Sequence, residues 1–146
     1  MAPRRQQTRP SNSAPGEPPS KGLGLTRRLH DLVREHPDFE VLHEPSPDIY
    51  CFRYVPNGLA DRQEESGVHT LLDRLNLEIV EAVRRGGLAL VAATRVGGRA
   101  AIRASICSQA TSEEDVDAAF EAVARWGRLL TRAYPVSHVR PTETEA

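Results

Sequence analysis

The chain has 146 residues and a formal net charge of −1, so it is long enough for one modest domain. The balanced charge gives no reason to expect nucleic acid or an anionic membrane surface as a partner. No apolar run approaches the roughly 20 residues of a membrane helix, and no hydrophobic signal-peptide segment follows the basic N-terminal residues. We therefore expect a cytoplasmic protein with a single domain.

Both ends of the chain are expected to be disordered. Residues 1–21 combine Pro, Ser, Gln and Arg with hardly any side chain to bury, and they include Lys21, the only lysine of the sequence. The basic pair Arg4-Arg5 could touch phosphate, but so short a cluster is more typical of a solvated tail. Residues 133–146 lose all periodicity and should fray. The predicted domain is therefore residues 22–132.

The domain begins with a predicted helix and a pair of strands. Apolar residues keep helical spacing over residues 23–35, until the His36-Pro37 step stops the pattern. Residues 39–43 and 49–54 are then extended segments, and the prolines and polar residues between them suit a connection. We expect these two strands to pair in antiparallel fashion.

Residues 49–54 alternate between two faces. The aromatic face is expected to lie in the core, and it consists of Tyr50, Phe52 and Tyr54. Cys51 and Arg53 lie on the other face. We expect Arg53 to point away from the helices, into solvent or onto another molecule.

A longer helix and a second hairpin follow. An apolar stripe predicts a helix over residues 68–85, with Gly86-Gly87 as its exit. The apolar run 88–94 and the glycine turn 96–99 then predict a strand that folds back onto the strand beginning at Ala100.

The strand 100–107 passes directly into a capped helix. Its apolar face comprises Ala100, Ile102, Ala104 and Ile106, and its other face comprises Ala101, Arg103, Ser105 and Cys107. Two pairs have the spacing of a helix cap, Thr111 with Glu114 and Ser112 with Asp115, and the second is the looser fit because Asp is shorter than Glu. One stripe of the closing helix should be buried: Val116, Ala119, Phe120, Val123, Trp126 and Leu130.

This order of elements predicts an α+β fold with two layers. An antiparallel or mixed sheet of three to four strands would carry the helices on one face. Arg103, Ser105 and plausibly Arg53 would then lie on the second face, exposed to solvent or to a second body.

Common catalytic and binding motifs are absent. No glycine loop has the spacing of a nucleotide site, and no two histidines or cysteines have the spacing of metal ligands. Cys51 and Cys107 are expected to be buried thiols and not a disulfide. Ser105 or Cys107 beside Arg103 would be an oddly placed nucleophile in mid-strand, so polar residues on an open sheet face are the simpler interpretation.

Five stretches carry a family resemblance, all in family order and spacing: Pro37-Asp-Phe-Glu40, Cys51-Phe-Arg-Tyr54, Leu72-Asp-Arg-Leu-Asn76, Ile102-Arg-Ala-Ser-Ile-Cys-Ser108 and Thr111-Ser-Glu-Glu-Asp-Val116. With them, residues 23–130 resemble the C-terminal small domain of the group II pyridoxal-phosphate-dependent amino-acid decarboxylases. The resemblance is closest to the aromatic-L-amino-acid decarboxylase branch. It implies the small domain of a fold-type-I enzyme, packed against a large domain that holds the cofactor.

The resemblance assigns Arg103 a role in substrate binding. In the family the matching arginine helps to hold the substrate carboxylate or the structure around it, and a planar guanidinium suits a carboxylate because it binds both oxygens. The family's Schiff-base lysine, its stacking histidine and its cofactor-pairing aspartate all belong to the large domain. Lys21 lies outside any corresponding motif. The resemblance therefore implies pyridoxal phosphate as the cofactor but gives this chain no catalytic, cofactor-binding or metal-binding residue of its own.

Three functional hypotheses follow. The chain could be a fragment or split subunit of a decarboxylase, inactive alone and assembled with a large-domain chain or as a homo-oligomer. It could instead be a non-catalytic binding or regulatory module that docks a partner through the open sheet face. The third hypothesis is an unrelated ligand-binding α+β domain.

Overall fold

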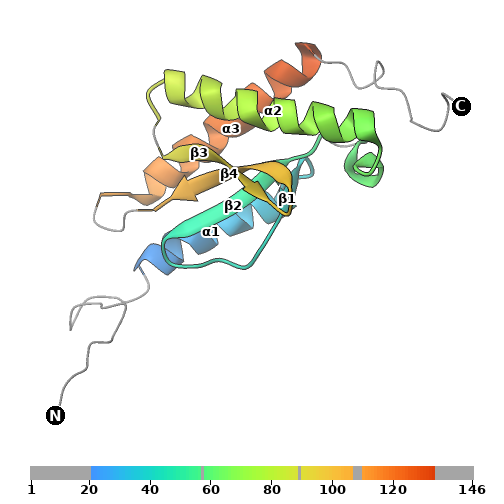
Figure 1. The fold of residues 1–146 in the computed structure, drawn as a ribbon. Coiled ribbons are helices and arrows are strands. Elements are labelled where there is room, and N and C mark those ends of the chain that lie inside the picture. The colour runs from blue at the N-terminus through green and yellow to red at the C-terminus, as the bar shows by residue number, and fades with distance from the viewer. Residues whose placement is uncertain (1–20, 57, 89, 107–109, 134–146) are drawn as a thin grey trace, which may run out of the picture.

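The computed structural model describes residues 21–56, 58–88, 90–106 and 110–133. Residues 1–20 of the expected leader (1–21) and residues 134–146 of the expected tail (133–146) lie outside these ranges, whereas Ala133, which was expected in the tail, is the last residue of the final helix. The described elements, in chain order, are α1 (Lys21–Glu35), β1 (Phe39–Val41), β2 (Ile49–Tyr54), the short 3-10 helix η2 (Ala60–Arg62), α2 (Ser66–Arg85), β3 (Val91–Val96), β4 (Arg99–Ser105) and α3 (Glu113–Ala133). Lys21 was expected in the leader but is the first residue of α1 (Figure 1). Gly22, which precedes the first leucine of the helix, is buried as well.

The four strands form one antiparallel sheet in the order β1-β2-β4-β3. The hairpin of β1 and β2 and the hairpin of β3 and β4 are therefore both present, as predicted. The two hairpins join through β2 and β4, where Cys51 lies directly across from Arg103 and Phe52 from Ile102. This central pairing places the two strands with the strongest alternation side by side.

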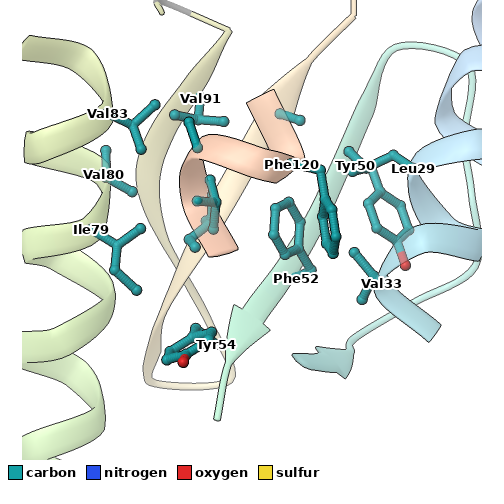
Figure 2. Close-up of a cluster of buried hydrophobic side chains, with 14 of the residues drawn as sticks. Leu29, Val33, Tyr50, Phe52, Tyr54, Ile79, Val80, Val83, Val91 and Phe120 are labelled. Atoms are coloured by element: carbon teal, nitrogen blue, oxygen red, sulfur yellow. The ribbon is translucent and has the colours of Figure 1, made fainter. Parts of the chain in front are cut away.

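Helices α1, α2 and α3 cover one face of the sheet and leave the other face without a helical layer (Figure 1). Figure 2 shows the core between these layers, with Ile79 and Val83 of α2 on one side, Val33 of α1 on the other, and Phe52 and Phe120 between them. The expected apolar faces of both central strands are buried: Tyr50, Phe52, Tyr54, Ala100, Ile102, Ala104 and Ile106. The two-layer α+β prediction is confirmed.

The element ends follow local chemistry, and several differ from the predicted bounds: β1 ends at Val41 and not at residue 43, and α2 begins at Ser66 and not at residue 68. The looser of the two candidate caps closes the start of α3, because Ser112 and Asp115 exchange hydrogen bonds of 2.9 Å and 3.1 Å between their side chains and backbone N–H groups. Strand β3 begins at Val91 and not at residue 88, and Leu88 instead packs against the core from the connection. The tight turn before β4 requires glycine, because Gly97 and Gly98 have φ values of 61° and 81°.

A buried amide locks α2 onto the end of β2. Asn76 accepts a hydrogen bond from the Tyr54 N–H at 2.8 Å and donates one to the Tyr54 carbonyl at 2.9 Å. Its side chain is fully buried and also donates to the Leu72 carbonyl. Because a buried backbone group without a partner is costly, this one side chain completes the hydrogen bonding of the strand where its ladder ends.

Tyr54 also requires a glycine on α3. A Cβ atom built on Gly127 would meet the Tyr54 ring at 2.6 Å, closer than real Cβ atoms approach other groups. The ring is 1% exposed and has little room to move. Gly127 therefore lets α3 approach the sheet closely.

We predict that Gly127→Ala destabilises the domain relative to Gly24→Ala. Both glycines lie inside helices, so alanine brings a similar gain in helix propensity of up to about 1 kcal/mol at each. At Gly24 nothing lies within 4 Å of the added Cβ, whereas at Gly127 it meets the ring. Urea unfolding should show Gly127→Ala to be less stable than Gly24→Ala by about 1–3 kcal/mol. Equal stability would contradict the close packing of α3 on Tyr54.

Candidate functional site on the outer face of the sheet

The face of the sheet opposite the helices, called here the outer face, carries the charged residues of the central strands. Its members on β2 are Ile49, Cys51 and Arg53, and its members on β4 are Arg99, Ala101, Arg103 and Ser105. Glu40 of β1 lies across from Arg53, and Ala92 of β3 lies across from Arg103. The two arginines in mid-strand, Arg53 and Arg103, have very different surroundings.

Arg53 is fully buried by groups of its own chain, so the expectation that it faces solvent or another molecule is wrong. Its guanidinium donates to the Ala100 carbonyl at 2.9 Å, to the Gln63 side chain at 2.8 Å and to the Asp73 carboxylate at 2.9 Å. The segment after η2 and the first half of α2 supply the last two partners. Gln63 also accepts a hydrogen bond from Arg99, so this end of the outer face is closed.

Asp73 is the acidic centre of that closed end. Besides Arg53 it accepts a hydrogen bond from the Ala100 N–H at 2.9 Å and a longer one from Arg95 at 3.4 Å. Burial by itself would raise the pKa of Asp73, but the hydrogen bonds from Ala100, Arg53 and Arg95 outweigh burial and hold its pKa below the ordinary value of 3.8. The carboxylate is therefore ionised and ties α2 to both central strands.

Arg103 has no such partners. It is half-buried, its Nε atom is buried without a hydrogen-bond partner, and it forms no ion pair with any described residue. Directly across from it lies Cys51, a buried free thiol, as expected. Burial raises the pKa of the Cys51 thiol, and the positive charge of Arg103 offsets part of that rise. This end of the outer face therefore presents a cation that no residue in the described part of the chain neutralises.

The remaining candidates on this face form no catalytic arrangement. Ser105 is exposed at the end of β4, and no described side chain is within hydrogen-bonding distance of its hydroxyl. Cys107 lies outside the described residues. No group of three potential metal-ligating side chains occurs in the described ranges, and no described helix is long and apolar enough to cross a membrane.

The described residues do not fit pyridoxal phosphate. The cofactor needs a lysine for its aldehyde, and Lys21 lies at the first turn of α1, away from the outer face. The shallow hollow beside it is lined by Gly24, Leu25 and residues 110–113, among which there is neither an aromatic ring nor an imidazole to stack on the cofactor. The acid of that hollow, Glu113, is exposed and would repel a phosphate group.

Gln63, Asp73 and Asn76 also matter for this face. Sequence reasoning did not assign roles to them. One signal was available: Asn76 lies four residues after Leu72, so it falls on the apolar stripe of α2, where a polar side chain needs a buried partner. Nothing comparable marked Gln63, which comes from an irregular segment.

We predict that truncation of the two arginines changes the stability of the domain by very different amounts. Arg53→Ala leaves Asp73 and Gln63 without their partner in a buried setting and should cost about 3–5 kcal/mol of unfolding free energy. Arg103→Ala removes a cation without a partner in the domain and should change stability by less than about 1 kcal/mol. Urea denaturation of the two variants checks this contrast. A large loss of stability in Arg103→Ala would mean that Arg103 serves the fold.

Asp73 should also dominate the acid sensitivity of the domain. Since its pKa is depressed by folding, its stabilising effect is complete above the unfolded-state pKa and is lost as the pH falls through the lower folded-state pKa. Unfolding free energy should therefore decrease between about pH 5 and pH 2, and Asp73→Asn should flatten that decrease. Asp117→Asn is the comparison: the hydrogen bond from Arg28 also holds the pKa of Asp117 below its ordinary value, but this pair is exposed, so the substitution should flatten the decrease less than Asp73→Asn does. An equal effect of both substitutions would contradict the special role of Asp73.

No protein-family model matches this chain, but curated proteins and solved structures resemble it. Tryptophan decarboxylase 1 of Oryza sativa subsp. japonica is 32% identical over 102 residues, which are 69% of this chain and 19% of that protein. Tyrosine decarboxylase 2 of Arabidopsis thaliana is 24% identical over 110 residues, 75% of this chain and 19% of that protein. A crystal structure of Oryza sativa TDC with PLP superposes with a TM-score of 0.64 at 27% identity, covering 75% of this chain and 22% of that one.

The matches cover 69% to 75% of this chain, and the chain spans only about a fifth of the length of the relatives it matches. Sequence similarity and structural similarity of the backbone both lead to these decarboxylases. The described domain therefore corresponds to a part, about one fifth, of the group II pyridoxal-phosphate-dependent decarboxylases, in the branch that includes tryptophan and tyrosine decarboxylases.

Proposed function

We propose that this chain is the C-terminal small domain of a pyridoxal-phosphate-dependent amino-acid decarboxylase and acts by docking onto a large domain that holds the cofactor. The large domain comes from another polypeptide or from a further part of the same one. Under this proposal residues 22–132 are inactive alone. The assembled enzyme is a cytoplasmic carboxy-lyase that acts on a small amino acid.

The observation that carries the proposal is that the two arginines of the outer face differ in their hydrogen-bond partners. Arg53 has three hydrogen-bond partners inside the domain, whereas the Nε atom of Arg103 is buried and has none. A buried donor without a partner is costly, so it calls for an acceptor from outside the domain. Arg103 as a whole is only half-buried, so an acceptor from outside the domain can reach the part of its side chain that stays exposed.

A carboxylate is the acceptor that fits Arg103 best. A guanidinium binds a carboxylate through two parallel charge-assisted hydrogen bonds, and partial burial strengthens them by lowering the local dielectric. In the assembled enzyme this carboxylate belongs to the substrate or to the structure that surrounds it. Arg103 is then a substrate-binding residue, and the cofactor, pyridoxal phosphate, is held entirely by the large domain because Lys21 is unsuited to it.

The central experiment is complementation. The full chain is co-expressed with Oryza sativa tryptophan decarboxylase 1 from which the matched segment has been removed. We expect the two polypeptides to copurify and to restore release of carbon dioxide from an aromatic amino acid. The chain alone, mixed with pyridoxal phosphate, should show no imine absorption.

The outcomes separate the hypotheses. Copurification without turnover would favour a non-catalytic binding module that uses the same face. No association, together with a stoichiometric lysine adduct on the isolated chain, would contradict both the small-domain proposal and the module.

We further predict that Arg103→Lys impairs the complemented enzyme without unfolding the domain. Lysine keeps the charge but loses the paired N–H groups, so substrate affinity should fall by about tenfold or more. Steady-state kinetics measure this as a rise in KM. The matched control is Arg99→Lys on the same strand, whose hydrogen bond to Gln63 lies at the closed end. Unchanged substrate affinity in Arg103→Lys would remove Arg103 from the substrate site.

A further inference from the structure

Strand β3 forms one edge of the sheet, next to α2 (Figure 1). Among the described strands it pairs with β4 alone, and the hydrogen bond from the Ser105 N–H to the Leu90 carbonyl shows which backbone groups point toward β4. The backbone groups of successive residues point to opposite sides of a strand. Even-numbered residues of β3 therefore bond to β4, whereas Val91, Ala93 and Arg95 direct their N–H and carbonyl groups away from the sheet.

The middle of this edge is open. The Val91 carbonyl accepts a hydrogen bond from the Arg84 side chain at 2.8 Å, but the backbone groups of Ala93 and Arg95 have no partner in the described part of the chain. Ala93 lies across from Ile102 on the helical side of the sheet, yet it is exposed. Helix α2 therefore leaves room beside the middle of β3. Unpaired backbone groups on an edge strand are a template for another extended chain.

The charges along the β3 edge are mostly positive. Arg84 is exposed beside the first residue of β3 and forms no ion pair with a described residue, and Arg95 is exposed near the other end of the strand. Arg95 contacts the Asp73 carboxylate, but only at 3.4 Å, and the same acid binds Arg53 at 2.9 Å. Because this single acid serves two arginines, the edge keeps a positive charge that favours an acidic ligand.

We propose that the β3 edge binds an extended acidic segment of another protein, which adds a further antiparallel strand to the sheet. The backbone of this segment pairs with the free N–H and carbonyl groups of Ala93 and Arg95. An acidic side chain opposite Ala93 then lies between two cations. Arg95 is two residues away along β3, about 7 Å, and Arg84 is bound to the carbonyl two residues away in the other direction.

The other side of β3 determines the alternate positions of the ligand. Thr94 and Val96 lie across from Ala101 and Arg99 on the outer face, where β-branched side chains of a neighbouring strand suit them. The recognised pattern is therefore an alternation of acidic and β-branched residues. A second copy of the chain fits less well, because it would bring its own basic edge to the same place. Arg103 takes no part, so this inference stands or falls separately from the proposed function.

The first test measures peptide binding to the full chain by fluorescence polarisation. The probe is a labelled peptide of six residues in which glutamate and valine alternate, and we expect saturable binding. Replacing its glutamates by lysines should weaken binding by about tenfold or more, because like charges then meet at the edge.

Methylation of the peptide backbone tests the predicted pairing. The glutamate N–H groups face β3 in the antiparallel arrangement, so methylating them should weaken binding by about tenfold or more. Methylating the valine N–H groups is the matched control. These groups point away from β3, and the affinity should change by less than about twofold.

Ala93→Pro tests the edge in the protein itself. Proline removes an N–H group that points away from the sheet and leaves the hydrogen bonds to β4 in place, and edge strands tolerate proline at such positions. Circular dichroism and urea unfolding verify the fold of the variant. Its affinity for the glutamate peptide should fall by about tenfold or more, whereas Ala93→Thr keeps the N–H group and should bind like the wild type.

Arg84→Gln tests the charge at the edge. Glutamine can still donate to the Val91 carbonyl but carries no charge, so binding of the glutamate peptide should weaken by about threefold or more. Arg125→Gln is the matched control, because Arg125 is an exposed arginine of α3, and it should leave the affinity unchanged.

Four results would overturn the proposal. One is that the glutamate peptide fails to bind at any concentration, and another is that it binds equally well after methylation of its glutamate N–H groups. Unchanged affinity in a folded Ala93→Pro variant would place the peptide elsewhere. A dimer of the chain that disappears in Ala93→Pro would assign the edge to a second copy.

Discussion

The structure depends on the buried ion pair between Arg53 of β2 and Asp73 of α2, which is closed by hydrogen bonds to Ala100 and Gln63. An unpaired charge at either position would be expensive to bury, so the two central strands and α2 have to come together in this arrangement. The neighbouring contact of Asn76 with Tyr54 satisfies the backbone at the same place. Two of the family stretches, residues 51–54 and 72–76, are therefore two halves of one contact.

This contact also divides the outer face into two functional parts. The closed end of the outer face is occupied by groups of the domain itself, whereas at the open end the Nε atom of Arg103 has no acceptor among the described residues. A domain that satisfies one mid-strand arginine so completely and leaves the other unsatisfied is suited to meet an acidic group from elsewhere.

The spacing of apolar residues and the residue types at tight turns were enough to predict most of the helices and strands. The alternation of β2 and β4 predicted their buried faces, and the glycines at 97 and 98 predicted the hairpin, because both signals depend on neighbours in sequence. The choice between the two caps of α3 was less secure: spacing allowed both, and the shorter acid, Asp115, proved to make the reciprocal bonds. The start of β3 was misplaced because an apolar run marks burial, and Leu88 is packed against the core without belonging to a strand.

The sequence by itself determined the fold class, the inward and outward residues of the central strands, and a resemblance that sequence and backbone similarity to decarboxylases both support. Only the tertiary structure decided which of the two outward arginines is available. Arg53 and Arg103 are indistinguishable by alternation, and their difference comes from Asp73 and Gln63, which lie 20 and 10 residues from Arg53 along the chain. The burial and pairing of a charge depend on residues that are distant in sequence but in contact in the fold. Local sequence patterns carry no information about such contacts.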